Sequence, residues 1–289
     1  MQTLKESLSS KKFTITAEIC PPKGTDTSDF LKKAQLLKGK IAAANVTDNQ
    51  RAVMRLSSLA CSVILLKEGI DPVFQMTCRD RNRIALQSDI MGASVLGIKN
   101  ILALSGDHVS FGDHREAKPV FDLDSVQLVQ VIDKLNKGTN MKDMPLKGGT
   151  DFFIGAVVAP EADPVEPEMI KFEKKVEAGA RFFQTQAIYN MEKFHRFYEY
   201  AKRFGVKILG GILLLKSAKM ANFLNTNVPG VKVPKHLIDE LEKAQDQLEK
   251  GIEIAARQVN ELRSFCDGAH IMAIGQEESV VRIIEGAVL

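Results

Sequence analysis

Short strand-like segments alternate with helix-like segments along the whole chain, and this alternation constrains the fold more than any other feature. The segments rich in β-forming or apolar residues are 13–19, 42–46, 72–77, 100–104, 152–158, 181–185, 206–213 and 269–273. The helix-like segments are 27–39, 52–68, 81–95, 123–137, 166–178, 190–204, 217–224, 236–264 and 276–288. Strands that alternate with helices form parallel sheets, because each helix returns the chain to the same edge. Eight repeats predict a closed (β/α)8 barrel.

A closed barrel accounts for eight repeats better than an open, doubly wound sheet does. Open sheets typically bind a dinucleotide at a G-x-G-x-x-G turn, and neither that motif nor a Walker motif occurs here. A chain of 289 residues suits one barrel. We therefore predict a single α/β domain over 1–289, a TIM barrel, with 1–12 as an N-terminal lead-in helix. Residues 236–264 carry one apolar stripe and are expected to form a single long helix.

Charge and hydropathy exclude several kinds of partner. The chain has 39 basic and 36 acidic residues, a net charge of +3, and no dense basic run with interleaved aromatic residues, so we expect no nucleic-acid partner. No stretch approaches the roughly 20 apolar residues that span a bilayer, and the first residues lack the apolar core of a signal peptide. We expect a cytoplasmic protein with no membrane attachment.

The cysteines and histidines do not predict a metal site. Cys20, Cys61, Cys78 and Cys266 are widely separated, without the C-x-x-C spacing of zinc and iron–sulfur sites. The five histidines show no H-E-x-x-H or other tight metal-binding spacing. His108 and His114 share a loop, where a metal is the alternative to two solvated histidines. We therefore predict no metal bound by this chain.

Polar residues follow the predicted strands, where a barrel of this kind builds its active face. The clearest example is the buried run 100–104, which stops at Ser105-Gly106-Asp107 and is followed by a long loop without a helical or strand period. The strand-end residues expected to converge are Glu18, Thr47, Thr77, Asp107, Glu161 and Gln186, together with the segment after Leu213. Glu18 and Asp107 suit proton transfer and stabilisation of a developing cation. The alternative is that each carboxylate caps a turn or pairs with a neighbouring base.

Six short motifs, in order along nearly the whole chain, resemble the methylenetetrahydrofolate reductase family. They are T-A-E-I-C-P-P-K from residue 16, M-T-C at 76–78, L-A-L-S-G-D at 102–107, K-K-V-E-A-G-A at 174–180, Q-T-Q at 184–186 and G-G-I-L at 210–213. The resemblance implies a flavin-dependent TIM barrel that reduces 5,10-methylenetetrahydrofolate to 5-methyltetrahydrofolate in one-carbon metabolism.

The resemblance also implies roles for individual residues. Glu18 matches the general acid of the family's E-x-x-P-P motif, which helps to open the five-membered ring and gives a reactive iminium. Asp107 matches an aspartate near the flavin and the pterin that favours this cation. Gln186 matches a glutamine that contacts the pterin. Phe223 matches an aromatic residue that packs against substrate or nicotinamide, although an aromatic residue on a short amphipathic helix is often part of the core.

The resemblance places a flavin, FAD or FMN, at a further set of positions. The implied cofactor-binding residues are Thr47, Gln75, Ser105, Gly106, Asp107, Ala159, Asp163, Glu168 and Lys175. Three departures bear on the choice: many relatives have His at Gln75, Arg at Ser105, and a Y-P-E-x-H run over residues 159–163. An arginine and an aromatic residue that could hold the flavin's tail are therefore absent. This counts against FAD and leaves FMN open, and loss of tight flavin binding is a further alternative.

The run N-V-T-D-N-Q-R at 45–51 resembles the branch of this family found in acetogens and other anaerobes. Members of that branch often work with a zinc- or iron–sulfur-containing partner subunit. The resemblance therefore implies NADH or an electron-transfer partner as the electron donor. Any metal centre would belong to the partner, and an oligomer is expected.

Two other functions remain open. One is a pterin-binding barrel that transfers a methyl group to a corrinoid, which needs no flavin. The other is a barrel that serves chiefly as an interaction subunit of an electron-transfer complex. A yellow colour on purification separates the first from the reductase, and activity of the isolated chain with an artificial donor separates the second.

Overall fold

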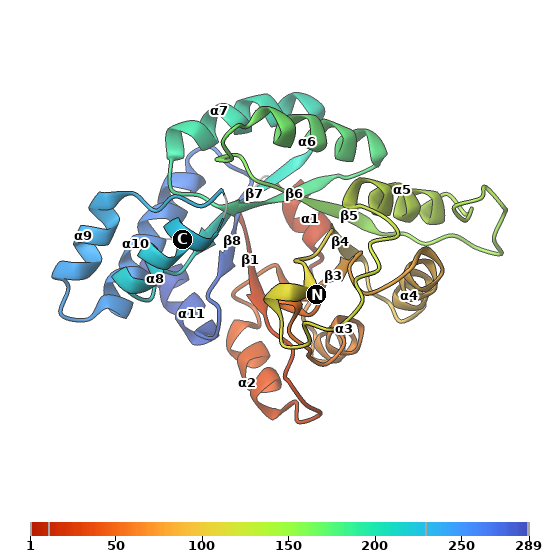
Figure 1. Cartoon of the computed structure of the whole chain (residues 1–289), viewed down its shortest axis with the longest axis horizontal. Coiled ribbons are helices and arrows are strands. Elements are labelled where there is room, and N and C mark those ends of the chain that lie inside the picture. The colour runs from red at the N-terminus through yellow and green to blue at the C-terminus, as the bar shows by residue number, and fades with distance from the viewer. Residues whose placement is uncertain (1, 11, 229, 288–289) are drawn as a thin grey trace.

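Eight parallel strands close into one barrel, which confirms the predicted (β/α)8 fold (Figure 1). The strands are β1 (Thr14–Ile19), β2 (Ala43–Val46), β3 (Pro72–Thr77), β4 (Asn100–Leu104), β5 (Phe153–Val158), β6 (Phe182–Ala187), β7 (Lys207–Leu213) and β8 (Gly268–Met272). Each pairs with its neighbours in sequence, and β8 closes the ring on β1, with Thr16 opposite His270. This computed structural model describes residues 2–10, 12–228 and 230–287.

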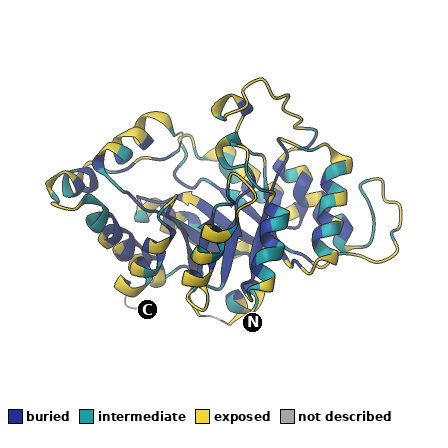
Figure 2. Ribbon diagram, turned by 90° about the horizontal axis from the view of Figure 1, so that it is seen from below, coloured by how far each residue is buried: buried dark blue, intermediate teal, exposed yellow. Residues whose placement is uncertain are grey.

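The helices surround the barrel (Figure 1). They are α1 (Leu4–Ser9), α2 (Ser28–Leu37), α3 (Ser58–Lys67), α4 (Arg83–Val95), α5 (Ser125–Asn136), α6 (Glu166–Ala178), α7 (Met191–Ala201), α8 (Ala218–Asn227), α9 (Lys235–Lys243), α10 (Gln247–Arg263) and α11 (Glu277–Gly286). Short 3-10 turns, η1 (Gln50–Ala52), η2 (Val109–Phe111) and η3 (Lys202–Phe204), lie among them. The strands are buried while the helices expose their outer faces (Figure 2). None of the described helices is long and apolar enough to cross a membrane.

Two helix predictions are wrong in extent. The single helix expected over 236–264 is interrupted after Lys243, and Asp246 caps the second helix by accepting a hydrogen bond from the Glu249 N–H at 3.0 Å. The helix expected from residue 52 begins only at Ser58, because the chain first makes the η1 turn. An apolar stripe cannot report such breaks, since local capping and turn geometry decide them.

Helix α1 closes the amino-terminal end of the barrel. Its Leu4 and Leu8 are buried and pack in one cluster with Leu102, Phe182 and Leu209, which point into the barrel. The expected lead-in helix over 1–12 is thus a helix of six residues over Leu4–Ser9; positions 1 and 11 of that prediction, and 288 of the last predicted helix, lie outside the described residues. With this end filled, the carboxyl ends of the strands are left to form a cavity.

Candidate functional site

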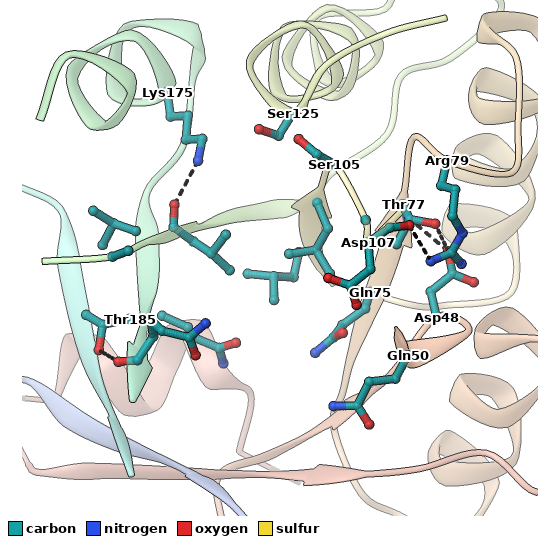
Figure 3. Close-up of a pocket in the computed structure, with 18 of the residues that line it drawn as sticks. Asp48, Gln50, Gln75, Thr77, Arg79, Ser105, Asp107, Ser125, Lys175 and Thr185 are labelled. Atoms are coloured by element: carbon teal, nitrogen blue, oxygen red, sulfur yellow. Dashed lines mark hydrogen bonds between the residues drawn. The ribbon is translucent and has the colours of Figure 1, made fainter. Parts of the chain in front are cut away.

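A cavity of about 640 Å³ opens at the carboxyl ends of the strands (Figure 3). This volume is in the range of sites that bind a cofactor or a small-molecule substrate. Ten of the predicted site residues line it: Glu18, Gln75, Thr77, Ser105, Gly106, Asp107, Ala159, Glu168, Lys175 and Gln186. They come from β1, β3, β4, β5, β6 and the segments that follow them. The fold therefore brings together residues that are far apart in sequence.

Glu18 projects from the end of β1 with a side chain that is 15% exposed. Its Oε2 accepts a hydrogen bond from the Gln50 Nε2 at 3.3 Å. Its Oε1 lies 3.8 Å from His270 Nε2, and His270 Nδ1 lies 2.9 Å from the Thr16 hydroxyl. Glu18 is thus a mostly buried carboxyl group with polar neighbours on both oxygens, at the edge of the cavity.

Asp107 reaches the cavity from the loop after β4. Gly106 permits this placement, since its φ is +90° and an added Cβ would lie 3.0 Å from the Thr77 Cβ. The Arg79 guanidinium donates to the Asp107 carbonyl at 3.4 Å and so supports the loop. The Asp107 carboxylate itself is exposed to the cavity, on the same side as Gln75 (Figure 3).

A buried ionic network supports this side of the cavity. Asp48 accepts hydrogen bonds from the Thr77 N–H and hydroxyl, both at 2.9 Å, and from Arg81 at 2.8 Å. Burial opposes ionisation of Asp80, yet hydrogen bonds and charge from Arg79 lower the pKa of Asp80 below its ordinary value. Of these residues, sequence reasoning selected only Thr77, as a strand-end residue. The signal was present in the polar runs that follow β2 and β3, residues 47–51 and 78–81.

The floor of the cavity carries two pairs of polar side chains that sequence reasoning also missed. Asn45 on β2 and Gln184 on β6 exchange two hydrogen bonds across the barrel, at 2.7 and 3.0 Å. His270 on β8 and Thr16 on β1 form the other pair. All four side chains are buried. Buried amides and imidazoles need such partners, so these pairs fix the floor.

Lys175 lies on the opposite wall from Asp107 (Figure 3). Its Nζ donates to the Val157 carbonyl at 2.8 Å, and its side chain is buried. Burial lowers the pKa of Lys175, while the charge of Glu168 acts in the opposite direction. Within the described residues Lys175 forms no ion pair with a carboxylate. A buried cation in this state is suited to an anionic ligand.

Four predicted residues do not line the cavity: Thr47, Glu161, Asp163 and Phe223. Thr47 is buried behind it, with its hydroxyl 3.3 Å from Cys20 Sγ. Asp163 is exposed and lies 4.0 Å from the Lys232 ammonium group. Phe223 is 50% exposed on α8.

Glu161, expected at the active face, instead accepts hydrogen bonds from the backbone N–H groups of Tyr189 and Asn190, both at 2.7 Å. Burial raises the pKa of Glu161, although these two hydrogen bonds act against the rise. Glu161 therefore holds the loop between β6 and α7.

Among the described residues no three His, Cys, Asp or Glu side chains are grouped to hold a metal ion.

The comparison with protein-family models and the comparison with individual known proteins point to the same family. The family model for methylenetetrahydrofolate reductase matches residues 3–287. Methylenetetrahydrofolate reductase 1 of Schizosaccharomyces pombe is 26% identical over 291 residues, which cover 95% of this chain and 46% of that protein. The 5,10-methylenetetrahydrofolate reductase of Buchnera aphidicola subsp. Acyrthosiphon pisum is 26% identical over 246 residues, 80% of this chain and 75% of that protein. The chain spans less than half the length of the fission yeast and nematode relatives.

Among solved structures, an uncharacterized protein from Clostridium thermocellum that binds two copies of 5-methyl-5,6,7,8-tetrahydrofolic acid has a TM-score of 0.70. It is 18% identical, and the match covers 99% of both chains. An F420-dependent secondary alcohol dehydrogenase has a TM-score of 0.57 at 11% identity, covering 96% of this chain and 99% of its own. At these identities the likeness establishes the shared barrel fold.

Proposed function

The chain belongs to the methylenetetrahydrofolate reductase family, and from this we propose that it reduces 5,10-methylenetetrahydrofolate to 5-methyltetrahydrofolate with a bound flavin. The observation that carries the proposal is the placement of Glu18 and Asp107. Both line one cavity, from the ends of β1 and β4, although they lie far apart in the sequence. An acid and a separate carboxylate around one substrate are what this reaction requires.

Glu18 is proposed as the general acid. The substrate holds its one-carbon unit between two nitrogens of a five-membered ring. Transfer of the Glu18 proton to one nitrogen lets its bond to the bridging carbon break, which leaves an iminium cation on the other nitrogen. Addition of a hydride to this carbon then gives the methyl group. A mostly buried carboxyl group beside a cavity suits the transfer, because few waters compete for its proton.

Asp107 is proposed to stabilise the cation that this step creates. Its carboxylate faces the cavity, and Arg79 fixes the loop that carries it through the backbone carbonyl. A fixed negative charge in a partly dry site stabilises a developing positive charge at little reorganisation cost. Gln186 lines the same cavity and is proposed to contact the pterin.

The wall from β3 to α6 fits a flavin. Lys175 is a buried cation without a described carboxylate partner and could bind a flavin phosphate, while Gly106 allows a planar ring to approach the backbone. The proposed flavin-binding residues that line the cavity are Gln75, Ser105, Gly106, Asp107, Ala159, Glu168 and Lys175. When bound, the flavin would accept electrons from a donor and supply the hydride. FAD and FMN remain alternatives, and NADH or an electron-transfer partner would reduce it.

Purification of the chain followed by its absorbance spectrum, identification of the released flavin and an anoxic assay tests the proposal. We expect a yellow protein that forms 5-methyltetrahydrofolate from 5,10-methylenetetrahydrofolate with a reduced viologen dye. A colourless protein that binds neither added FAD nor added FMN and forms no product would refute it. Methyl transfer from 5-methyltetrahydrofolate to cobalamin by that protein would instead support the methyltransferase alternative.

A further inference from the structure

The turn after β2 has an unusual backbone for its sequence. Asn49, Arg51 and Ala52 have φ values of 46°, 58° and 56°, in the left-handed region, and none of them is glycine. Non-glycine residues rarely adopt this conformation, and a cluster of three persists only where the surrounding structure holds it. Such clusters are found where a side chain must be aimed at a functional site. Gln50, within this turn, is the side chain that it aims into the cavity (Figure 3).

Contacts from three directions hold the turn. Arg79 donates to the Asn49 carbonyl at 3.2 Å, and the Asn49 side chain accepts the Arg55 N–H at 3.0 Å. The loop after β4 presses against the other end, where a Cβ added to Gly112 would lie 1.8 Å from the Ala52 carbonyl oxygen. These contacts leave the turn little freedom to relax.

The Gln50 amide is oriented at both ends. Its Nε2 donates to Glu18 Oε2 at 3.3 Å, and its Oε1 accepts from Cys20 Sγ at 3.3 Å. Burial raises the pKa of the Cys20 thiol, which favours the protonated thiol that donates to this oxygen. An amide that accepts from Cys20 through its oxygen presents its N–H to Glu18.

The surroundings of Glu18 differ between its two oxygens. Oε2 is held by Gln50, whereas Oε1 faces His270 on β8 at 3.8 Å, beyond hydrogen-bond distance. Arg55 and Glu277 also lie on this side and act electrostatically on the adjacent Cys20, and Asp48, Arg51 and Asp107 line the same cavity. A proton on Glu18 is therefore best placed on Oε1, with Oε2 as the acceptor for Gln50.

We propose that Gln50 is a positioning residue that holds Glu18 Oε2 and so directs the acidic proton on Oε1 into the cavity. This rests on the proposed role of Glu18 as the acid. The strained turn places the Gln50 amide beside Glu18. Resemblance to the family assigned no role to Gln50.

Gln50→Leu is the direct test, because it removes both ends of the amide at similar volume. We expect kcat for folate reduction to fall roughly 10- to 100-fold, as misplacement of a reacting group does, while KM changes little. Loss of an N–H donor to the carboxylate favours its protonated form, so the titration of Glu18 should move to higher pH. Carbon-13 NMR of labelled glutamate reports this titration, with the Glu18 signal identified by its loss in Glu18→Gln.

A matched control and a second variant separate positioning from general damage. Gln35→Leu removes a glutamine that donates to the Glu68 carboxylate on the exposed outside of the barrel, and it should leave kcat and the Glu18 titration unchanged. Gly112→Ala should act like Gln50→Leu, because the new Cβ displaces the turn, whereas Gly92→Ala, whose Cβ meets nothing within 4 Å, should not.

An unchanged kcat together with an unchanged Glu18 titration in Gln50→Leu would overturn the proposal. The NMR readout needs no turnover, so it separates this inference from the proposed function. If the wild-type chain forms no 5-methyltetrahydrofolate but Gln50→Leu still shifts the Glu18 titration, the reductase proposal fails and the coupling of Gln50 to Glu18 stands.

Discussion

At the residue scale, the two central carboxylates have different surroundings. Glu18 is 15% exposed and lies between an amide and an imidazole. Asp107 lies on an exposed loop, and the Arg79 guanidinium hydrogen-bonds to its backbone carbonyl. The first environment suits a group that gives up a proton, and the second suits a group that keeps its charge. Two predictions follow from this difference.

Glu18→Gln should abolish most folate reduction while a bound flavin is retained. General acid catalysis typically contributes about 10²–10⁴-fold, so the folate-dependent rate should fall within that range. Reduction of the flavin by its donor involves no proton on the folate and should be nearly unchanged. Stopped-flow measurement of the two half-reactions gives both values, with the exposed Glu285→Gln as control. Near-normal folate turnover in Glu18→Gln would exclude the acid role.

Asp107→Asn should slow folate reduction by about 10²–10³-fold, the usual loss when one fixed electrostatic group is removed. The reduction potential of a bound flavin should rise, because a reduced and anionic flavin would no longer meet a negative charge. Steady-state kinetics and a redox titration measure the two effects, with the exposed Asp151→Asn as control. If rate and potential both equal those of the wild type, Asp107 is only a turn residue.

At the scale of elements, α1 shows how a short helix is fixed by distant groups. The Asp71 carboxylate, at the start of β3, accepts the Leu4 N–H at 2.7 Å and the Asn100 amide at 2.9 Å. Thr3 and Glu6 complete the helix start through a capping box. Six residues would not form a stable helix alone, so α1 depends on this cap and on burial of Leu4 and Leu8.

The pH dependence of stability should differ in sign between Asp71 and Asp122. Burial raises the pKa of Asp71 above its ordinary 3.8. Its contribution to the free energy of unfolding is therefore present at low pH and is lost as pH rises from 3.8 through the pKa of the folded state. A hydrogen bond from Arg83 lowers the pKa of Asp122 to about 2, so its contribution is present above 3.8 and lost as pH falls toward 2.

Urea denaturation of Asp71→Asn and Asp122→Asn across this pH range tests both signs. The stability of the wild type relative to Asp71→Asn should decrease with rising pH, and relative to Asp122→Asn it should increase. Equal slopes for the two variants would contradict the assignment.

At the scale of the whole molecule, the barrel is closed at one end and open at the other. Helix α1 fills the amino-terminal end, so the proposed substrate, cofactor and electron donor would share the cavity at the carboxyl ends of the strands. A small donor needs only an exposed flavin edge, whereas a nicotinamide must stack at hydride-transfer distance. Phe223, proposed for that slot, lies on α8 and does not line the cavity.

We therefore expect the isolated chain to oxidise reduced viologen dyes readily, with methylenetetrahydrofolate as acceptor, and to use NADH poorly unless a partner is present. Anoxic stopped-flow mixing of the purified chain with NADH decides between these routes. Flavin bleaching at a rate that matches full turnover, without any partner, would contradict the partner dependence and indicate an ordinary NADH-dependent reductase.

The amino-acid pattern was sufficient to predict the barrel and the positions of its candidate catalytic residues. β3, β4 and α6 have the predicted bounds because turn residues and glycine mark where each apolar run stops. Parallel strands in a closed barrel all end at one face, so Glu18, Asp107 and Gln186 could be assigned to it without coordinates. The break between α9 and α10 could not be predicted, since a continuous apolar stripe runs through both helices.

The contacts between polar groups could not be predicted from the sequence, because they depend on how the strands close into a barrel. Asn45 pairs with Gln184 across the barrel, and His270 reaches Thr16 and Glu18 because β8 closes on β1. Gln50 reaches Glu18 through a left-handed turn held by a loop from another repeat. Local propensity carries no information about such contacts. They arise from closure of the barrel and from packing between segments far apart in the chain.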